Sequence, residues 1–175
     1  MFEIIKGGKA DLPTVRQLAE VIFPHTYASM ITPEQIDYMM EWMYSPESLR
    51  KQLDEGQQLF LLLRDGEAVG FMTVEPQAEL LFHLQKIYVL PSQQGCGAGK
   101  RLINAAVEHV RSSIPEGKTA LLELNVNRQN SAVGFYEKMG FVVDRQVDAH
   151  IGNGFYMTDY IMVKKITNDR FTPTY

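Results

Sequence analysis

Hydrophobic positions recur along the chain with two different spacings, and the spacing changes near Gly56. Between Leu12 and Phe23 apolar residues return every three or four positions, which is the period of a helix with one buried face. A second helix is predicted to begin at Thr32, whose side chain can cap it. Pro46 is expected to interrupt that helix and to open a third, short one that runs up to Gly56. The first third of the chain is therefore predicted to be rich in helix.

Beyond Gly56, short and dense apolar runs replace the helical period. The dipeptide Asp65-Gly66 between two such runs is typical of a tight hairpin turn. The predicted strands are 2–6, 58–64, 68–74, 80–90, 119–126, 141–148 and 155–163, and the predicted later helices are 102–110 and 131–139. We see no repeat or linker in this order. The sequence predicts one domain over 1–166, followed by a polar C-terminal tail over 167–175.

Composition narrows the classes of protein that the chain can represent. Its 175 residues carry a net charge of −4, with 45% hydrophobic and 22% charged residues. This mixture is typical of a globular domain, and it argues against disorder and against nucleic acid as the main partner. The single cysteine, Cys96, favours a reducing compartment, and the longest apolar run, 59–63, is too short to span a membrane. With no export signal at residues 1–4, we expect a cytoplasmic protein without a membrane partner.

A glycine-rich loop over residues 94–100 is the first place that indicates chemistry. It stands between the end of a predicted strand at Pro91 and the start of a helix, with glycine at alternate positions, Gly95, Gly97 and Gly99. Such glycines let the backbone come close to a ligand, and a helix N-terminus points unpaired amides at it. The pattern predicts an anion site, with phosphate as the first candidate.

Spacing separates this loop from two common nucleotide-binding motifs. A P-loop needs glycine at position 94 and Ser or Thr at position 101, which hold Gln94 and Arg101. A dinucleotide-binding fingerprint needs glycine at position 100, which holds Lys100. Neither motif is present. A tight strand-to-helix connection that simply needs glycines remains the alternative interpretation.

The second place is the segment from Asn125 to Phe141. Asn130 is a good helix N-cap and Gly140 a good C-terminal stop, so folding alone explains much of this segment. Tyr136 lies on a different helical stripe from the apolar residues around it. Taken alone, such a tyrosine is more typical of a half-buried packing residue than of a catalyst.

Together these segments resemble the GNAT superfamily of acetyl-CoA-dependent N-acetyltransferases. The resemblance rests on the strand end Leu84 to Pro91, on the Gln-x-x-Gly-x-Gly pattern of Gln94, Gly97 and Gly99, and on the segment Asn130 to Phe141. It covers most of residues 2–165. It implies an α/β (α+β) GNAT-like fold, with a mixed, mostly antiparallel central sheet of six or seven strands flanked by helices. A splayed pair of parallel strands, diverging after Leu84 and Val126, is expected to form the acetyl-CoA slot.

The resemblance also implies which residues bind the acetyl donor. The backbone of Ile87, Tyr88 and Val89 is expected to pair with the pantetheine arm, and the amides of residues 94–100 to hold the pyrophosphate. The residues assigned to acetyl-CoA binding are Ile87, Tyr88, Val89, Gln94, Gly95, Cys96, Gly97, Ala98, Gly99, Lys100, Asn127, Asn130 and Lys138. The family's asparagine before the last helix would fall on Gln129 here, so Asn130 and Asn127 both stay open for its role. No metal is expected.

The same resemblance implies direct attack of a neutral amine on the thioester. Tyr136 is expected to share or return a proton to the departing thiol, whose pKa should be about 8.5, while a backbone amide near Val89 meets the oxyanion. For the base that deprotonates the amine, the chain offers candidates only by position. They are Glu75, Glu79, His83 and Glu123, and for His83 a histidine at a strand edge is the alternative reading.

The identity of the acceptor is the least defined inference. Glu34, Asp37 and Glu41 make one face of a predicted helix acidic, which suits a cationic amine but is also typical of a solvated face. Residues 23–48 and 151–157 give a weaker resemblance to the polyamine (spermidine and spermine) acetyltransferases. We therefore expect acetylation of a small primary amine, with a polyamine as first candidate and a homodimer as assembly. A protein or peptide amine is the enzymatic alternative, and a non-catalytic coenzyme A sensor is the other.

Overall fold

The computed structural model describes residues 1–169 and contains a single seven-stranded sheet with the strand order β1-β2-β3-β4-β5-β7-β6. The strands are β1 (Phe2–Gly7), β2 (Gln58–Arg64), β3 (Glu67–Ala78), β4 (Leu81–Val89), β5 (Thr119–Asn127), β6 (Val142–Gly152) and β7 (Phe155–Thr167). The α-helices are α1 (Leu12–Tyr27), α2 (Pro33–Tyr44), α3 (Pro46–Asp54), α4 (Ala98–Ser113) and α5 (Ala132–Lys138). All pairs are antiparallel except β4 with β5. The predicted mixed sheet is confirmed.

Local sequence explains the boundaries of the N-terminal helices. The Thr32 hydroxyl accepts a hydrogen bond from the backbone amide of Gln35 at 3.2 Å and so caps α2. Ser45 ends α2 in an extended conformation, and its side chain accepts from the amide of Ser48 at 3.1 Å to cap α3. Pro46, directly after it, has no amide to lose at the first position of a helix. The expected break between the two helices therefore falls at Ser45.

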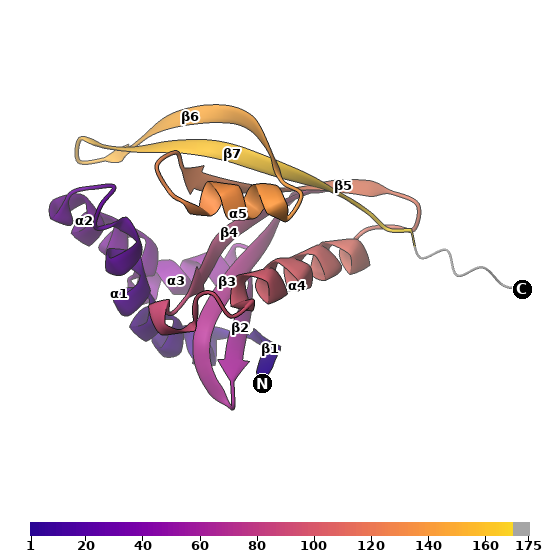
Figure 1. The fold of residues 1–175 in the computed structure, drawn as a ribbon, viewed down its shortest axis with the longest axis horizontal. Coiled ribbons are helices and arrows are strands. Elements are labelled where there is room, and N and C mark those ends of the chain that lie inside the picture. The colour runs from indigo at the N-terminus through magenta and orange to yellow at the C-terminus, as the bar shows by residue number, and fades with distance from the viewer. Residues whose placement is uncertain (170–175) are drawn as a thin grey trace, which may run out of the picture.

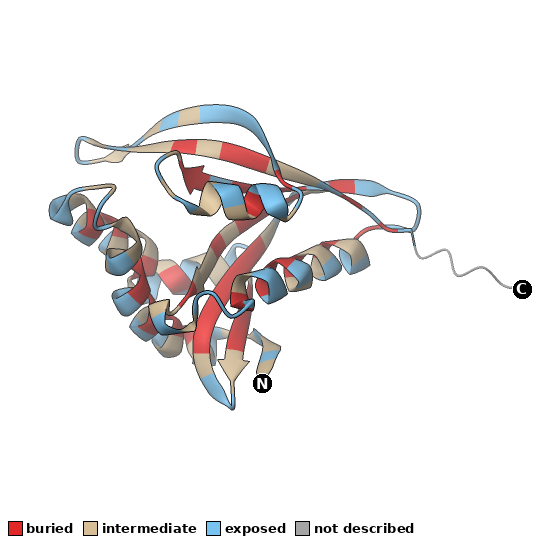
Figure 2. Cartoon of the chain, in the orientation of Figure 1, coloured by how far each residue is buried: buried red, intermediate tan, exposed pale blue. Residues whose placement is uncertain are grey.

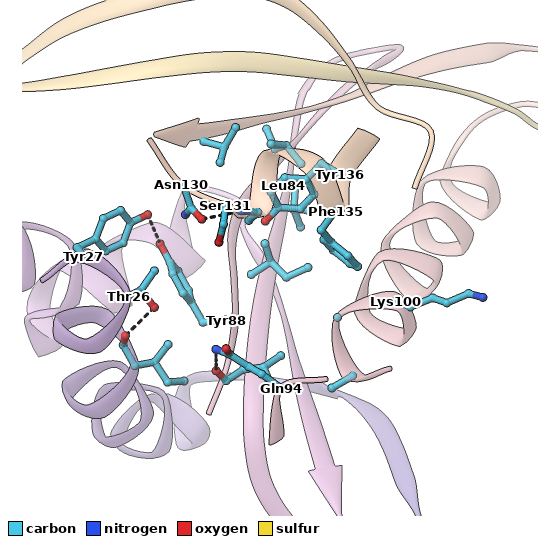
Figure 3. Close-up of a pocket in the computed structure, with 18 of the residues that line it drawn as sticks. Thr26, Tyr27, Leu84, Tyr88, Gln94, Lys100, Asn130, Ser131, Phe135 and Tyr136 are labelled. Atoms are coloured by element: carbon cyan, nitrogen blue, oxygen red, sulfur yellow. Dashed lines mark hydrogen bonds between the residues drawn. The ribbon is translucent and has the colours of Figure 1, made fainter. Parts of the chain in front are cut away.

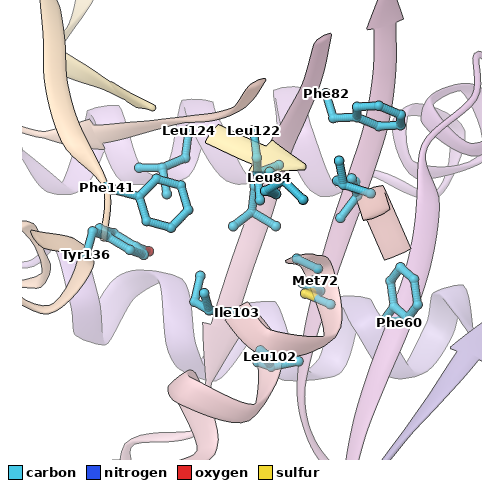
Figure 4. Close-up of a cluster of buried hydrophobic side chains, with 14 of the residues drawn as sticks. Phe60, Met72, Phe82, Leu84, Leu102, Ile103, Leu122, Leu124, Tyr136 and Phe141 are labelled. Carbon is cyan, nitrogen blue, oxygen red and sulfur yellow. The ribbon is translucent and has the colours of Figure 1, made fainter. Parts of the chain in front are cut away.

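Helices cover both faces of the sheet (Figure 1). Helices α1, α2 and α3 lie against the face that we call the α1 face, and α4 and α5 lie against the opposite face, the α4 face. Each face has its own buried apolar cluster, and burial is concentrated on the strands and on the inward sides of the helices (Figure 2). On the α4 face, Leu102 and Ile103 of α4 pack over Leu84, Leu122 and Leu124 of the central strands (Figure 4).

The central parallel pair separates partway along its length. β4 and β5 pair only over Leu81–Leu84 and Leu121–Leu124. At the same point Gln85 is an extra residue in β4, because Val74 pairs with Leu84 and Thr73 with Lys86. Such a bulge bends its strand, so β4 turns away from β5 just where their pairing ends. The splayed pair is confirmed, and the divergence on β5 begins at Leu124, two residues before the predicted Val126.

The last two strands are longer than their apolar runs predicted. β7 continues through Thr167, and the following Asn168 is buried, with its side-chain amide donating to the carbonyl of Ile114 at 2.8 Å. Regular structure and its side-chain contacts thus continue to Asn168. The remainder of the predicted tail, 170–175, lies outside the described residues. Over residues 1–169, no helix combines the length and apolar character that crossing a membrane requires.

Candidate active site

A cavity of about 680 Å³ opens where β4 and β5 diverge. Its walls come from α1, from β4 and β5, from the loop before α4 and from α5 (Figure 3). The predicted site residues that line it are Ile87, Tyr88, Val89, Gln94, Gly95, Gly97, Ala98, Gly99, Lys100, Asn130 and Tyr136. The two segments that carried the sequence argument, far apart in the chain, therefore meet around one space.

Three predicted residues do not line this cavity. Cys96 is exposed in the glycine loop, and its thiol faces the carbonyl of Gln94 at 3.8 Å. Lys138 is exposed near the end of α5. Asn127 lines a second, smaller cavity instead. The side chains of Cys96 and Lys138 thus stand outside the cavity that collects the other predicted residues.

The glycine loop adopts a conformation that only glycine accepts readily. Gly95 and Gly97 have φ angles of 80° and 81°, in the left-handed region. Gly97 is the N-cap of α4 and offers no capping side chain, so the amides of Ala98, Gly99 and Lys100 in the first turn remain free to bind a ligand. At these amides the helix dipole also favours negative charge, which fits a phosphate.

Gly99 has a different reason for lacking a side chain. A Cβ atom there would stand 3.1 Å from Cζ of Phe135, which is tighter than nearly all real Cβ contacts. Gly99 therefore lets α4 approach α5 closely beside the cavity. The Lys100 side chain, by contrast, extends away from the other labelled residues and is exposed (Figure 3).

The upper part of β4 offers backbone groups to a ligand. Within the described residues its pairing with β5 stops at Leu84, so the edge of residues 85–89 that would face β5 has no strand beside it. The side-chain amide of Gln94 donates to the carbonyl of Val89 at 3.2 Å and ties the glycine loop to this strand (Figure 3). An extended ligand containing amides can add to such an edge as another strand would.

Tyr136 of α5 is buried, with 8% of its surface exposed, and it lines the cavity. Its ring packs against those of Phe135 and Phe141 with centroids 5.4 and 5.9 Å away. Burial, together with the nearby hydroxyl of Tyr27, raises the pKa of Tyr136 well above the ordinary value of 10.0. No residue of 1–169 makes a hydrogen bond with its hydroxyl. The phenol is therefore neutral at pH 7 and has a proton to donate into the cavity.

The structure distinguishes the candidate asparagines. Asn130 lines the large cavity, and its Oδ1 accepts from the amide of Ala132 at 2.8 Å, which orients the start of α5. Asn127 lines the smaller cavity and accepts from the amide of Gln129 at 2.9 Å. Gln129 lines neither cavity. Of the three, only Asn130 stands where the acetyl donor is expected.

The smaller cavity, of about 60 Å³, lies beside the large one. The two share Tyr27, Gln85, Tyr88 and Asn125 in their walls, and the hydroxyls of Tyr27 and Tyr88 are 3.4 Å apart (Figure 3). Three methionines complete much of the wall: Met39, Met43 and Met157. This cavity adjoins the large cavity at the divergence of the strands, through the four residues that both share.

Contacts between α2 and the β6–β7 hairpin hold the smaller cavity closed on one side. Nε2 of Gln35 donates to the carbonyl of Tyr156 at 2.7 Å, and the hydroxyl of Tyr38 donates to the carbonyl of Ile151 at 2.7 Å. The ring of Tyr38 also lies 5.4 Å from that of Phe155. Much of the aromatic and methionine cluster in α2 thus serves packing, while Met39 and Met43 reach the cavity wall.

Asp159 of β7 is a candidate functional residue that was not predicted from the sequence. It lines the smaller cavity, is only 2% exposed, and receives a hydrogen bond from Nδ2 of Asn125 at 3.3 Å. Burial raises the pKa of its carboxyl above 3.8, although Asn125 and Arg128 oppose the shift. The available signal was a lone charged residue within an otherwise uncharged predicted strand, 155–163.

The base candidates chosen by chain position lie elsewhere. Nδ1 of His83 and Oε1 of Glu123 are 3.0 Å apart in a buried pair on β4 and β5, and Glu75 accepts from Gln85 at 3.1 Å. Neither these residues nor Glu79 line either cavity. The acids predicted on α2, Glu34, Asp37 and Glu41, are exposed and line no cavity, which fits the solvated-face reading.

Comparisons with known proteins agree with this geometry. Residues 27–164 match the family model described as an acetyltransferase (GNAT) domain. The chain is 31% identical to a spermidine N(1)-acetyltransferase of Thermoplasma acidophilum over an alignment that covers 93% of this chain and 96% of that relative. It is 42% identical to the peptidyl-lysine N-acetyltransferase YjaB of Escherichia coli over 78 residues, which is 44% of each chain.

Solved structures extend the comparison to the fold. The crystal structure of the PaiA N-acetyltransferase from Thermoplasma acidophilum in complex with coenzyme A superimposes with a TM-score of 0.76 at 27% identity, covering 94% of this chain and 99% of that one. The family match spans well over half of the chain and includes both cavity-forming segments. The chain belongs to the GNAT family of acetyl-CoA-dependent N-acetyltransferases.

Proposed function

We propose that this protein transfers the acetyl group of acetyl-CoA to a primary amine of a small molecule, with a polyamine as first candidate. The observation that carries the proposal is the pair of adjoining cavities, which share Tyr27, Gln85, Tyr88 and Asn125. One cavity has the backbone edge and free amides that a long, phosphate-bearing donor needs. The other is narrow and has thioether and aromatic walls, which suit an aliphatic amine.

The donor is held along its length by backbone groups. The free edge of residues 85–89 pairs with the amides of the pantetheine arm, and the amides of residues 97–100 receive the pyrophosphate. Asn130 adds a side-chain contact at the start of α5. Holding the thioester at several points fixes its carbonyl carbon in position for attack.

The proposed role of Tyr136 is to stabilise the departing sulfur. The neutral amine forms a C–N bond with the carbonyl carbon, the C–S bond breaks, the coenzyme A thiolate leaves, and one proton of the amine nitrogen passes to solvent. The Tyr136 phenol donates a hydrogen bond to this thiolate. Because burial raises the phenol pKa well above the value of about 8.5 for a thiol, complete proton transfer is opposed. Stabilisation by the hydrogen bond is therefore the main contribution of the hydroxyl.

The test is release of coenzyme A thiol by the purified protein with acetyl-CoA and a panel of polyamines, diamines, monoamines, amino acids and short peptides. We expect small alkylamines to be acetylated faster than peptides. Faster turnover of lysine-containing peptides would support the protein-acetyltransferase alternative, for which the local similarity to a peptidyl-lysine N-acetyltransferase is the observation. Tight acetyl-CoA binding without turnover of any amine would overturn the enzymatic proposal in favour of the sensor.

Assembly and location are separate proposals. Val142 and Val143 of β6 are 61% and 45% exposed on an edge strand of the sheet, and this edge could pair with a second copy of the chain. We propose a homodimer, which light scattering of the purified protein tests directly. We also propose that the protein is a single domain, that it acts in the cytoplasm and that it holds no resident metal.

A further inference from the structure

Asp159 is the only charged side chain among the described residues that line the smaller cavity. The rest of the wall is formed by aromatic, aliphatic, thioether and neutral amide side chains. Asp159 is 2% exposed, and the one hydrogen-bond donor to its carboxylate in 1–169 is Nδ2 of Asn125, at the long distance of 3.3 Å. A buried carboxylate normally has stronger partners than this.

Arg128 lies near Asp159, but its guanidinium is engaged elsewhere. Nη2 of Arg128 forms an ion pair with Oδ1 of Asp148 at 2.6 Å, and Nη1 donates to the backbone carbonyl of Asp159 at 3.4 Å. Within residues 1–169 no Lys, Arg or His is within ion-pair distance of the Asp159 carboxylate. A ligand cation in the cavity would supply the missing partner and offset the cost of burying the negative charge.

The position of Asp159 defines which part of an acceptor it can contact. Asn125 lines both cavities and donates to Asp159, so the carboxylate stands one side chain behind the junction where donor and acceptor meet. When one nitrogen of the acceptor reacts at the junction, Asp159 can contact the opposite end of the same acceptor molecule. Met39, Met43 and Met157 provide apolar walls suited to the methylenes in between.

We propose that Asp159 determines acceptor specificity by binding the distal ammonium group of an α,ω-diamine or polyamine while the other nitrogen accepts the acetyl group. This inference rests on the proposed function and names the substrate class of that site. It makes Asp159 a recognition residue, because the proton of the reacting nitrogen is not assigned to it.

The test compares diamines with monoamines of equal chain length. We would measure kcat/KM for 1,4-diaminobutane and 1,5-diaminopentane against n-butylamine and n-pentylamine, in the wild type and in Asp159→Asn. The wild type should favour the diamines, and the substitution should lower their kcat/KM about 10- to 100-fold, the size of a lost charge-assisted hydrogen bond. The monoamine values should stay within about threefold, because their far end carries no charge.

Asp144→Asn is the matched control, since it removes one negative charge from an exposed residue of β6 that lines no cavity. It should leave the ratio of diamine to monoamine kcat/KM unchanged. Monoamine turnover in the same preparation also reports whether Asp159→Asn is folded. If that variant loses monoamine turnover too, the wild-type ratio decides alone.

The outcomes separate this inference from the function beneath it. A wild type that acetylates amines but shows no preference for diamines overturns the role of Asp159, as does a preference that survives Asp159→Asn. A wild type that acetylates no amine overturns the proposed function itself. A preference that disappears in Asp159→Asn and survives in Asp144→Asn supports both.

Discussion

The α4 face and the α1 face of the sheet have opposite chemical character where the strands diverge. On the α4 face, Leu84, Leu124 and Val126 continue a wholly apolar cluster beneath α4 and α5. Strand alternation and register place a series of buried polar side chains on the α1 face: Thr73, His83, Lys86, Glu123, Asn127 and Asp159. The large cavity passes between the two faces, because its walls include residues from both.

We propose that this difference divides the molecule into a donor side, on the α4 face, and an acceptor side, on the α1 face. The donor side is built from main-chain amides, glycines and an apolar support, so donor binding depends little on individual polar side chains. The acceptor side depends on individual side chains of α1, α2, β4, β5 and β7, so its specificity can change by single substitutions. If the two sides act independently, single substitutions should change stability, donor binding or acceptor choice one at a time.

Removing the phenol of Tyr136 should have the largest effect. In Tyr136→Phe we expect kcat to fall roughly 100- to 1,000-fold, the usual loss when one preorganised hydrogen-bond donor to a developing negative charge is removed. Acetyl-CoA affinity should stay within about twofold, because the ring keeps its packing on Phe135 and Phe141. Thiol release under saturating substrate and calorimetric titration measure the two quantities.

Tyr160→Phe is the control for that prediction. Tyr160 lies on β7 and packs against the α4-face cluster without lining either cavity, so its loss of a hydroxyl should not alter kcat. An unchanged kcat in Tyr136→Phe would remove this residue from the mechanism.

Buried charge on the α1 face should make stability depend on pH. Lys86 is 4% exposed, and burial lowers its pKa from 10.5 to about 8, although Glu75 opposes the shift. Above pH 8 the unfolded chain binds the proton that the folded chain has released, so stability rises with pH up to 10.5. The full shift corresponds to about 3 kcal/mol.

Buried tyrosines on both faces limit this rise in stability at higher pH. Burial raises the pKa of Tyr27, Tyr44, Tyr88 and Tyr136 above 10.0, so their contribution to stability is present below 10.0 and is lost as the pH rises further. We expect the unfolding free energy to increase from pH 8 and to decrease above pH 10, as measured by urea titration. Lys86→Met should abolish the increase, and Lys51→Met, an exposed control on α3, should retain it. An increase that persists in Lys86→Met would contradict this assignment.

The donor side was readable from the sequence because its signals are local. Alternating glycines before a helix and a tyrosine within a short capped helix form their motifs in adjacent residues. Asp159 belongs to no local motif and stands only as a lone charge in its strand, because its burial arises from the pairing of β7 with β5 and from the packing of α2 on the hairpin. The Gln85 bulge was equally invisible, since a bulge depends on the partner strand. Choosing base candidates by chain position therefore selected acids that the fold points elsewhere.

A side chain at Gly97 should weaken the donor side without touching the acceptor side. In Gly97→Val, a β-branched residue must adopt a φ of 81°, which the loop can avoid only by moving the amides of α4. We expect the Kd for acetyl-CoA to increase roughly 10- to 100-fold, measured by calorimetry. Gly134→Ala in α5 is the control, because an added Cβ meets nothing within 4 Å there. Equal affinities of the two variants would contradict a role for the loop conformation.

The smallest expected effect is a pH dependence of acceptor choice. Burial raises the pKa of Asp159 above 3.8, so the carboxylate and its preference for diamines are present above that raised value and are lost as the pH falls through it. The charged and titratable groups around Asp159 come from several neighbouring elements: Tyr27 of α1, Tyr88 of β4, Arg128 after β5, Asp148 and His150 of β6, and Tyr156 of β7. From α2, the residues that line the smaller cavity are neutral: Gln35, Met39 and Met43.

The ratio of diamine to monoamine kcat/KM isolates this effect. Protonation of the reacting amine at low pH slows both substrates alike, so this effect cancels in the ratio, whereas the charge on Asp159 affects only the diamine. We expect the ratio to decline by about tenfold as the pH is lowered from neutrality, because one charge-assisted contact is lost. His150→Gln, which removes the ring packed on Tyr156, should retain the decline, and Asp159→Asn should show a low and constant ratio. A decline that disappears in His150→Gln would instead assign acceptor choice to the hairpin, and the acceptor side would then depend on β6 rather than on the buried carboxylate of β7.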